Sequence, residues 1–191
     1  MLRNLHHTVN LFDTATTALF LGFLTACARG GGGSEHRLVY YESYDPRSLD
    51  PALSTDVPTG EMVTLLFDGL TQFDPDGRLL PALSDRWTAD QRGQRYQFHL
   101  RPGVTFHDGR PLVAADVKRA LLRVLNPQTR SGRVWPLLPI VGAADFADGR
   151  ARDVRGIEVL GDTAVAFRPT EPLPVFPKFL PMPVAAIVPS S

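Results

Sequence analysis

Two segments of the chain carry apolar residues at helical spacing. In residues 113–125 an apolar stripe lies opposite Lys118, Arg119 and Arg123, and Pro127 ends the predicted helix. A second helix is predicted over residues 58–70. The apolar positions are Val117, Ala120, Leu121, Val124 and Leu125 in the first helix, and Met62, Leu65, Leu66 and Leu70 in the second.

Elsewhere the period is that of strands. Residues 37–41 form a run of branched and aromatic side chains, and residues 96–101 alternate between apolar and polar positions. Hairpins are predicted around the turn at residues 74–77 and around Gly161-Asp162. In the second hairpin the side chains expected to point inward are those of Ile157, Val159, Val165 and Phe167. Helices and hairpins together predict an α+β (mixed α/β) fold.

The N-terminal segment is typical of an exported, lipid-modified protein. The apolar stretch Ala15–Ala26 is too short for the ~20 residues that a membrane-spanning helix needs, and it ends at Cys27, the only cysteine of the chain. A basic start, a short apolar stretch and small residues at the cut predict a lipoprotein signal peptide over residues 1–26, with Cys27 as the lipidation site. Residues 27–36 are glycine-rich and predict a flexible tether. The alternative is a frayed N-terminus with a buried free thiol.

Composition and charge argue against one class of partner and describe the kind of core the chain can form. The formal net charge is zero, and removal of residues 1–26 leaves it so, because Arg3 and Asp13 cancel. A neutral chain argues against nucleic acid, whose binding requires a concentrated basic surface. A hydrophobic content of 43% is ample for a globular core, and a single cysteine permits no internal disulfide.

No motif in the chain predicts catalysis. His107-Asp108 resembles half of a catalytic dyad, and an extracytoplasmic hydrolase using these two residues is one alternative, but no activated nucleophile accompanies them. A histidine in a turn is the better interpretation. His99 and His107 lack the spacing of a metal site, and residues 74–77 lack the downstream carboxylate of a calcium loop. We therefore expect a non-enzymatic protein without metal or cofactor.

A long series of short motifs occurs in a characteristic order. They are residues 48–51 (SLDP), 66–70 (LFDGL), 76–87 (DGRLLPALSDRW), 96–112 (YQFHLRPGVTFHDGRPL), 115–117 (ADV), 154–159 (VRGIEV), 171–172 (EP) and 186–189 (AIVP). In this order the chain resembles the extracytoplasmic solute-binding proteins of family 5, which deliver oligopeptides, dipeptides or nickel to ABC importers. The resemblance covers nearly all of the chain beyond residue 36.

The resemblance implies the N-terminal part of a type II periplasmic-binding-protein-like fold. Residues 37–191 would form mainly lobe I, with a small β-rich subdomain over 58–146 and a return into lobe I over 154–191. The implied function is the substrate-binding component of an ABC transporter in peptide transport. Its partners would be an oligopeptide or dipeptide solute and ABC permease subunits. The implied location is periplasmic or extracytoplasmic, with a lipid anchor in a membrane and a monomeric state.

The resemblance also implies which residues contact the solute. The stretch after the first strand, Ser43, Tyr44, Asp45 and Pro46, would line the cleft between the lobes, and Arg133 and Trp135 would reach it from the loop after the long helix. For two of these residues a purely structural role is the alternative to solute contact: Trp135 would be a core residue, and Asp45 would be a surface turn residue.

Length is where the chain departs from the family, whose members are more than twice as long. The second lobe and the residues that pair with ligand charges would lie in sequence absent here, so we expect a truncated form with an incomplete main sheet. The alternative is a stand-alone lipid-anchored domain that acts as a structural or interaction module and binds no solute.

Overall fold

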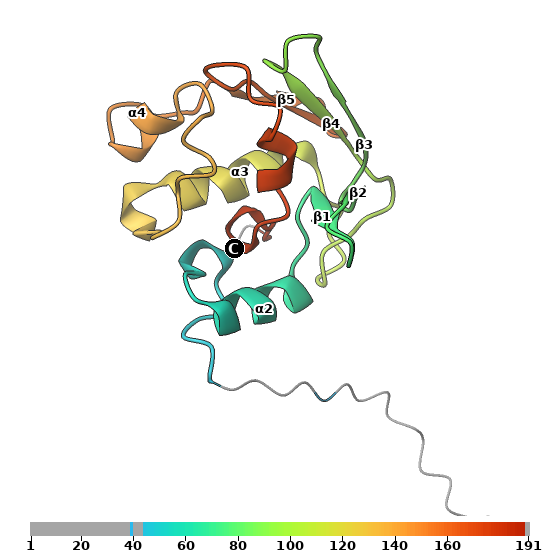
Figure 1. Ribbon diagram of the computed structural model, residues 1–191, viewed down its shortest axis with the longest axis vertical. Coiled ribbons are helices and arrows are strands. Elements are labelled where there is room, and N and C mark those ends of the chain that lie inside the picture. Colours follow the sequence, from blue (N-terminus) through green and yellow to red (C-terminus); the bar gives the residue numbers. More distant parts are fainter. Residues whose placement is uncertain (1–38, 40–43, 190–191) are drawn as a thin grey trace, which may run out of the picture. The chain divides into compact units, whose positions relative to one another are not determined.

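A computed structural model describes residue 39 and residues 44–189 (Figure 1). The predicted signal peptide, Cys27, the tether, Ser43 and all of the predicted first strand except Val39 lie outside the described residues. The helices are α2 (Val57–Leu66), α3 (Ala114–Leu125) and α4 (Ala143–Ala147). The strands are β1 (Thr71–Phe73), β2 (Leu79–Pro81), β3 (Ser84–Ala89), β4 (Tyr96–Leu100), β5 (Ile157–Leu160) and β6 (Ala164–Phe167). Short 3-10 turns are η2 (Pro51–Leu53), η3 (Pro127–Thr129), η4 (Phe176–Phe179) and η5 (Pro183–Ala185).

Both predicted helices form, although the helix predicted over residues 58–70 ends at Leu66, so that Leu70 lies outside it. Their first turns show why they begin where they do. α2 begins after Asp56, whose Oδ1 accepts a hydrogen bond from the Thr59 N–H at 2.9 Å, with Pro58 in the first turn. α3 begins after Val113, which has no side chain able to cap it. Instead the Oδ2 of Asp116 accepts from the Val113 N–H at 3.0 Å.

The strands form two antiparallel sheets. β1 pairs with β2 across the predicted turn at residues 74–77. The larger sheet has the order β3-β4-β6-β5, so β4 pairs with both its sequence neighbour β3 and the distant β6. The rings of Trp87 and Phe98 stack at 6.0 Å, and Phe98 meets Phe167 edge-on at 5.6 Å. This aromatic cluster lies in the core, between the sheet and the C-terminal segment that carries Phe176.

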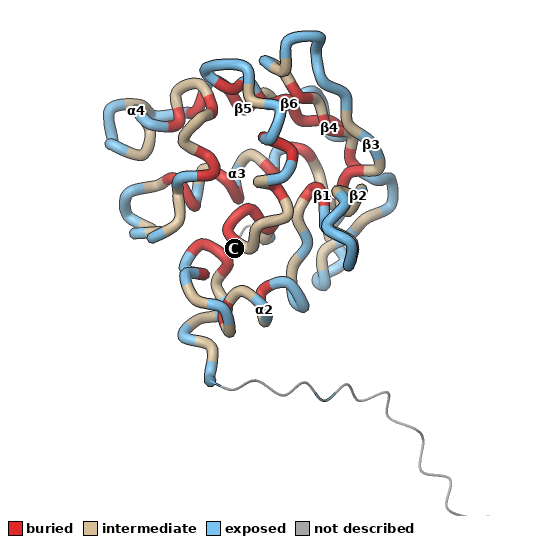
Figure 2. Tube along the Cα trace, in the orientation of Figure 1, coloured by how far each residue is buried: buried red, intermediate tan, exposed pale blue. Residues whose placement is uncertain are grey.

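The apolar spacing of α2 does not mark its buried face, and one expectation about an inward side chain is wrong. Leu65 and Leu66 are 54% and 48% exposed, and within α2 only Thr59 and Val63 are buried. The reason is that α2 lies at the rim of the described part, where η5 is its main neighbour (Figures 1 and 2). Val159, expected to point inward, is 40% exposed because β5 is an edge strand of the sheet.

The subdomain boundaries remain a prediction. The larger sheet takes β3 and β4 from the segment 58–146 and β5 and β6 from the segment 154–191. Strands from both predicted regions therefore share one sheet in the structure.

Candidate functional site

The predicted solute-contact residues fall into two groups. Tyr44 and Asp45 are exposed and Pro46 is partly buried, and none of the three lines a hollow among the described residues. Arg133 lies in the wall of a hollow beside the first turn of α2.

Trp135 lies on the same loop as Arg133 and is 52% exposed, so it is not a core residue. Its ring packs edge-on against Phe179, with centroids 5.4 Å apart.

The hollow that contains Arg133, which we call the α2 hollow, has a volume of about 290 Å³. Its walls come from the segment before α2, the exposed face of the first two turns of α2, the loop after α3, and η5. The lining residues are Thr55, Asp56, Val57, Gly60, Glu61, Thr64, Arg133 and Pro183. Three segments distant in sequence, residues 55–64, the loop with Arg133 and η5 with Pro183, therefore build one site.

The rim of the α2 hollow presents unpaired backbone donors. The N–H groups of Thr55, Asp56 and Val57 have no hydrogen-bond partner within the described part of the chain. Asp56 has the extended dihedral angles of a helix cap, φ −115° and ψ 168°. On the acceptor side, the Thr55 carbonyl oxygen is occupied by Nη2 of Arg133 at 2.8 Å. The rim is thus held in place by Arg133 and keeps its donors available.

Asp56 gives the hollow a fixed negative charge. The Thr59 N–H donates to its carboxylate and holds the pKa of Asp56 below its usual value, with smaller contributions from the Thr59 hydroxyl and the charges of Arg47 and Arg133. The second oxygen, Oδ2, is buried and has no hydrogen-bond partner among the described residues. Arg47 Nε lies 3.8 Å from it, on a side chain that is 85% exposed.

Residues 44–47 lie next to the first turn of α2, near the α2 hollow. The Arg47 N–H donates to the Thr59 hydroxyl at 3.2 Å, which ties this stretch to the first turn of α2. Tyr44, Asp45 and Pro46 precede this tie, so they lie close in sequence to the α2 hollow without lining it.

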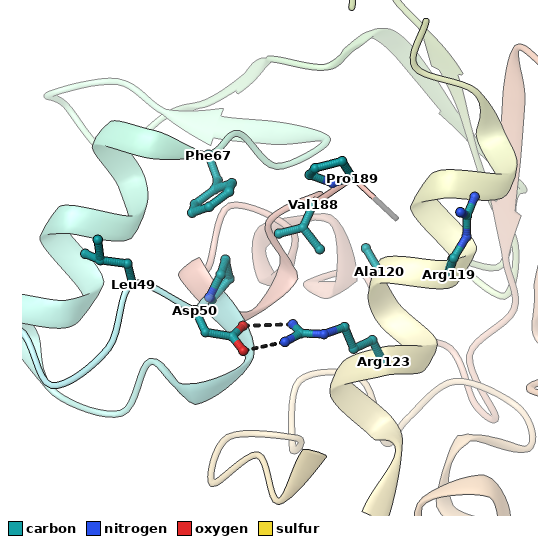
Figure 3. A pocket seen from close by; sticks show the side chains of 9 residues that line it. Leu49, Asp50, Phe67, Arg119, Ala120, Arg123, Val188 and Pro189 are labelled. Carbon is teal, nitrogen blue, oxygen red and sulfur yellow. Dashed lines mark hydrogen bonds and ion pairs between the residues drawn. The ribbon is translucent and has the colours of Figure 1, made fainter. Parts of the chain in front are cut away.

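A second hollow, larger than the α2 hollow at about 460 Å³, is lined by Asp50, Phe67, Arg119, Arg123 and Val188, among others (Figure 3). Asp50 and Arg123 face each other as a bidentate pair, with Nη1 to Oδ1 at 2.8 Å. This pairing lowers the pKa of Asp50 and raises that of Arg123. Arg119 Nη2 donates a hydrogen bond to Asp116 Oδ1 at 2.6 Å. Because its charged groups already have partners, this hollow offers a solute mainly apolar walls.

His107 and Asp108 show no catalytic arrangement. Both are exposed in a turn at the edge of a hollow of about 340 Å³, and Asp108 Oδ1 accepts from the Arg110 N–H at 2.9 Å. No hydrogen bond between the two side chains occurs in the described structure.

Over residues 39 and 44–189, no group of three or more His, Cys, Asp or Glu side chains is placed to hold a metal ion. Among the helices of that same part, none is both long and apolar enough to cross a membrane.

Sequence reasoning missed the segment 54–57 and Gly60. A signal was present, because Asp56 directly before Val57-Pro58 is a helix cap pattern with proline in the first turn. That pattern locates the helix start but says nothing about the loop that packs against it. The contact between Arg133 and Thr55 joins residues 78 apart in sequence.

Comparison with known proteins identifies the class. Residues 78–191 match the model of the bacterial extracellular solute-binding proteins, family 5. Because this match covers more than half of the chain, the chain belongs to that family, whose members bind substrates and are not enzymes.

Individual relatives agree with this assignment. The chain is 34% identical over 154 residues to the probable deoxycholate-binding periplasmic protein YgiS of Escherichia coli, covering 78% of this chain and 29% of that protein. It is 28% identical to the oligopeptide-binding protein OppA of Bacillus subtilis, covering 83% of this chain and 31% of that protein. The crystal structure of Haemophilus influenzae OppA in complex with a peptide superposes with a TM-score of 0.73 at 26% identity, covering 75% of this chain and 29% of the other. The predicted periplasmic-binding-protein-like fold is confirmed, and the chain spans about 30% of the length of these relatives.

Proposed function

We propose that this chain supplies the first wall of a peptide-binding receptor that captures its solute outside the cytoplasmic membrane and delivers it to an ABC permease. The family assignment supports binding as the activity, and several relatives bear names that denote oligopeptide or murein peptide binding. The predicted permease partner, monomeric state and extracytoplasmic location belong to this proposal.

The observation that carries the proposal is the rim of the α2 hollow. Three consecutive residues, Thr55 to Val57, present backbone N–H groups that are unpaired in the described structure beside a fixed arginine. A peptide main chain provides carbonyl oxygens at regular spacing, which are the natural partners of such donors. Val57 is 70% exposed and adds an apolar contact for a solute side chain.

The hollow is one wall of a site rather than a complete one. At about 290 Å³ and open to the surface, it buries only part of a solute, whereas binding pockets usually bury most of the ligand surface. We propose that a second lobe, like that of the two-lobed family members, closes over the hollow. In that closed state Tyr44, Asp45 and Trp135, all exposed here, and the undescribed Ser43 would contact solute or the second lobe together with Pro46.

A peptide titration followed by nuclear magnetic resonance tests the proposal. We expect trialanine added to the ¹⁵N-labelled 191-residue chain to shift the amide signals of Thr55, Asp56 and Val57. The expected dissociation constant is about 1 mM or weaker, because a single wall provides only part of the contacts, and this is too weak for calorimetry. Replacement of Arg133 with alanine should weaken binding severalfold, because the rim loses the group that holds it.

The matched control is Arg152→Ala, which removes an exposed arginine outside the α2 hollow and should leave the titration unchanged. Deoxycholate is titrated in parallel, since one relative is named for it. Shifts at 55–57 with deoxycholate and none with peptides would replace the peptide by an amphipathic solute. No shift at 55–57 with trialanine would contradict the proposed peptide site in this chain.

A further inference from the structure

Trp135 is directed outward by the turn in which it lies. The Leu137 N–H donates to the Val134 carbonyl oxygen at 3.0 Å and closes a turn around Trp135 and Pro136. Pro136 and Leu137 are buried and Val134 packs against the core, whereas Trp135 is 52% exposed. The largest apolar side chain of this turn thus forgoes the favourable free energy of burial that its neighbours gain. Packing of the turn does not explain this exposure.

The ring of Trp135 is nevertheless held in place. It packs edge-on against Phe179 at 5.4 Å, and Phe179 meets the fully buried Phe176 at 6.5 Å. Phe176 lies 5.4 Å from Phe167 of β6, so this row of rings ends in the hydrophobic core. A ring that is supported on one side and exposed on the other loses little conformational freedom when a ligand contacts it. Trp135 is therefore preorganised for such a contact.

Two connections place Trp135 beside the α2 hollow. On its own loop, Arg133 stands two residues earlier and lines the hollow. On the supporting side, the Phe179 carbonyl oxygen accepts from the Met182 N–H at 3.2 Å, and Met182 directly precedes Pro183 in the wall of the hollow. Both the loop that carries the ring and the segment that supports it therefore continue into the walls of the α2 hollow.

The two neighbouring surfaces suit different parts of one peptide. The rim of the hollow presents the unpaired backbone N–H groups of residues 55–57, which suit main-chain carbonyl oxygens. The exposed indole of Trp135 offers a flat apolar surface and an aromatic edge, which suit another aromatic ring.

We propose that Trp135 forms an aromatic subsite beside the α2 hollow, which selects peptides that carry a phenylalanine, tyrosine or tryptophan residue. The side chain of that residue packs against the exposed part of the indole while the main chain is held at the rim. This inference rests on the proposed peptide-binding function and specifies the class of peptide that the site prefers.

A titration of the ¹⁵N-labelled 191-residue chain tests the subsite. The ligands are trialanine and the three tripeptides that contain one phenylalanine and two alanines. We expect at least one phenylalanine peptide to bind about three- to tenfold more tightly than trialanine, which is the gain expected from an aromatic pair. The same peptide should shift the indole N–H signal of Trp135. The other tryptophan, Trp87, stacks on Phe98 in the core, and its indole signal should not move.

Three variants assign the preference to one residue. In Trp135→Ala the ratio of the two affinities should fall to about one, whereas Trp135→Phe should keep part of the preference because a smaller ring remains. The melting temperature and the Trp87 indole signal show whether each variant is folded. Phe73→Ala is the matched control, because Phe73 is a 46% exposed aromatic residue that does not line the α2 hollow. This control should leave the ratio unchanged.

The outcomes distinguish this inference from the function on which it rests. If trialanine shifts the signals of residues 55–57 but no phenylalanine peptide binds more tightly, the subsite is overturned and the peptide site stands. A preference that persists in Trp135→Ala would also overturn the subsite, since another residue would then contact the ring. If none of the four tripeptides shifts the signals of residues 55–57, both fall together.

Discussion

Asp116 shows how one residue secures the start of α3, the longest of the helices in the described residues. Its side chain is fully buried and accepts hydrogen bonds from Arg110 Nη1 at 2.9 Å, from Arg119 Nη2 at 2.6 Å and from the Val113 N–H at 3.0 Å. Burial by itself would raise the pKa of Asp116, but the hydrogen bonds from Arg110 and Val113 and the charges of both arginines outweigh it, so that pKa lies below its usual value. The Arg110 guanidinium also covers the Phe106 ring at 4.5 Å, which joins the preceding turn to α3.

The pKa of Asp116 predicts how stability depends on pH. A carboxylate whose pKa is lower in the folded state stabilises the fold above its unfolded value of about 3.9, and this contribution is lost as the pH falls through the folded pKa. We expect Asp116→Asn to lower the free energy of unfolding by about 2–3 kcal/mol at pH 7, because two arginines lose their partner. The difference from the unsubstituted chain, measured by urea denaturation, should shrink below about pH 4.

Asp148→Asn is the control for this prediction, because Asp148 and its partner Arg150 are 56% and 61% exposed. Such a surface pair contributes about 0.5 kcal/mol or less. A difference for Asp116→Asn that stayed constant from pH 7 into the acid range would show that the carboxylate charge is not what stabilises this site.

Among the elements, the contact between the start of β1 and the C-terminal segment depends on a glycine. Gly69 lies against the Leu180 backbone so closely that a Cβ would clash with the Leu180 carbonyl oxygen. Two residues on, the Thr71 hydroxyl donates to the Pro177 carbonyl oxygen at 3.2 Å. These two contacts hold segments more than 100 residues apart in sequence side by side.

We expect Gly69→Ala to destabilise the fold by about 3 kcal/mol, because backbone atoms on both sides must move to admit a methyl group. This corresponds to a fall in melting temperature of about 6–12 °C, measured by circular dichroism. Gly60→Ala, which introduces the same methyl group without a clash, serves as the comparison. A melting temperature for Gly69→Ala within 2 °C of the unsubstituted chain would show that the two segments separate at little cost.

In the whole molecule, the described part offers one wall of a binding site and leaves several large apolar side chains exposed. Among them, Leu49, Leu65 and Leu66 are each about half exposed. Together with coverage of about 30% of the relatives' length, this supports the proposal that further lobes complete the receptor.

The proposed lipid anchor at Cys27 is a second property of the whole molecule that can be tested. Cys27 lies outside the described residues, so the prediction rests on the signal sequence alone. With the 191-residue chain expressed in a bacterium, we expect Cys27→Ser to move the protein from the membrane fraction to the soluble fraction, because the thiol that carries the acyl chains is removed. Ser34→Ala in the tether is the control and should remain with the membranes. Equal membrane retention of Cys27→Ser would contradict the anchor.

The linear order of residues was sufficient to predict α2, α3 and the hairpins β1–β2 and β5–β6, because spacing, turn residues and proline act locally. The ordered motifs were likewise sufficient for the family and the fold class. The tertiary structure decided which faces are buried and which residues share a hollow. Arg133 meets Thr55 across 78 residues, and Leu65 is exposed although it lies on the apolar stripe of its helix. The physical reason is that burial and hydrogen bonding depend on neighbours from distant segments, which periodicity along one segment does not specify.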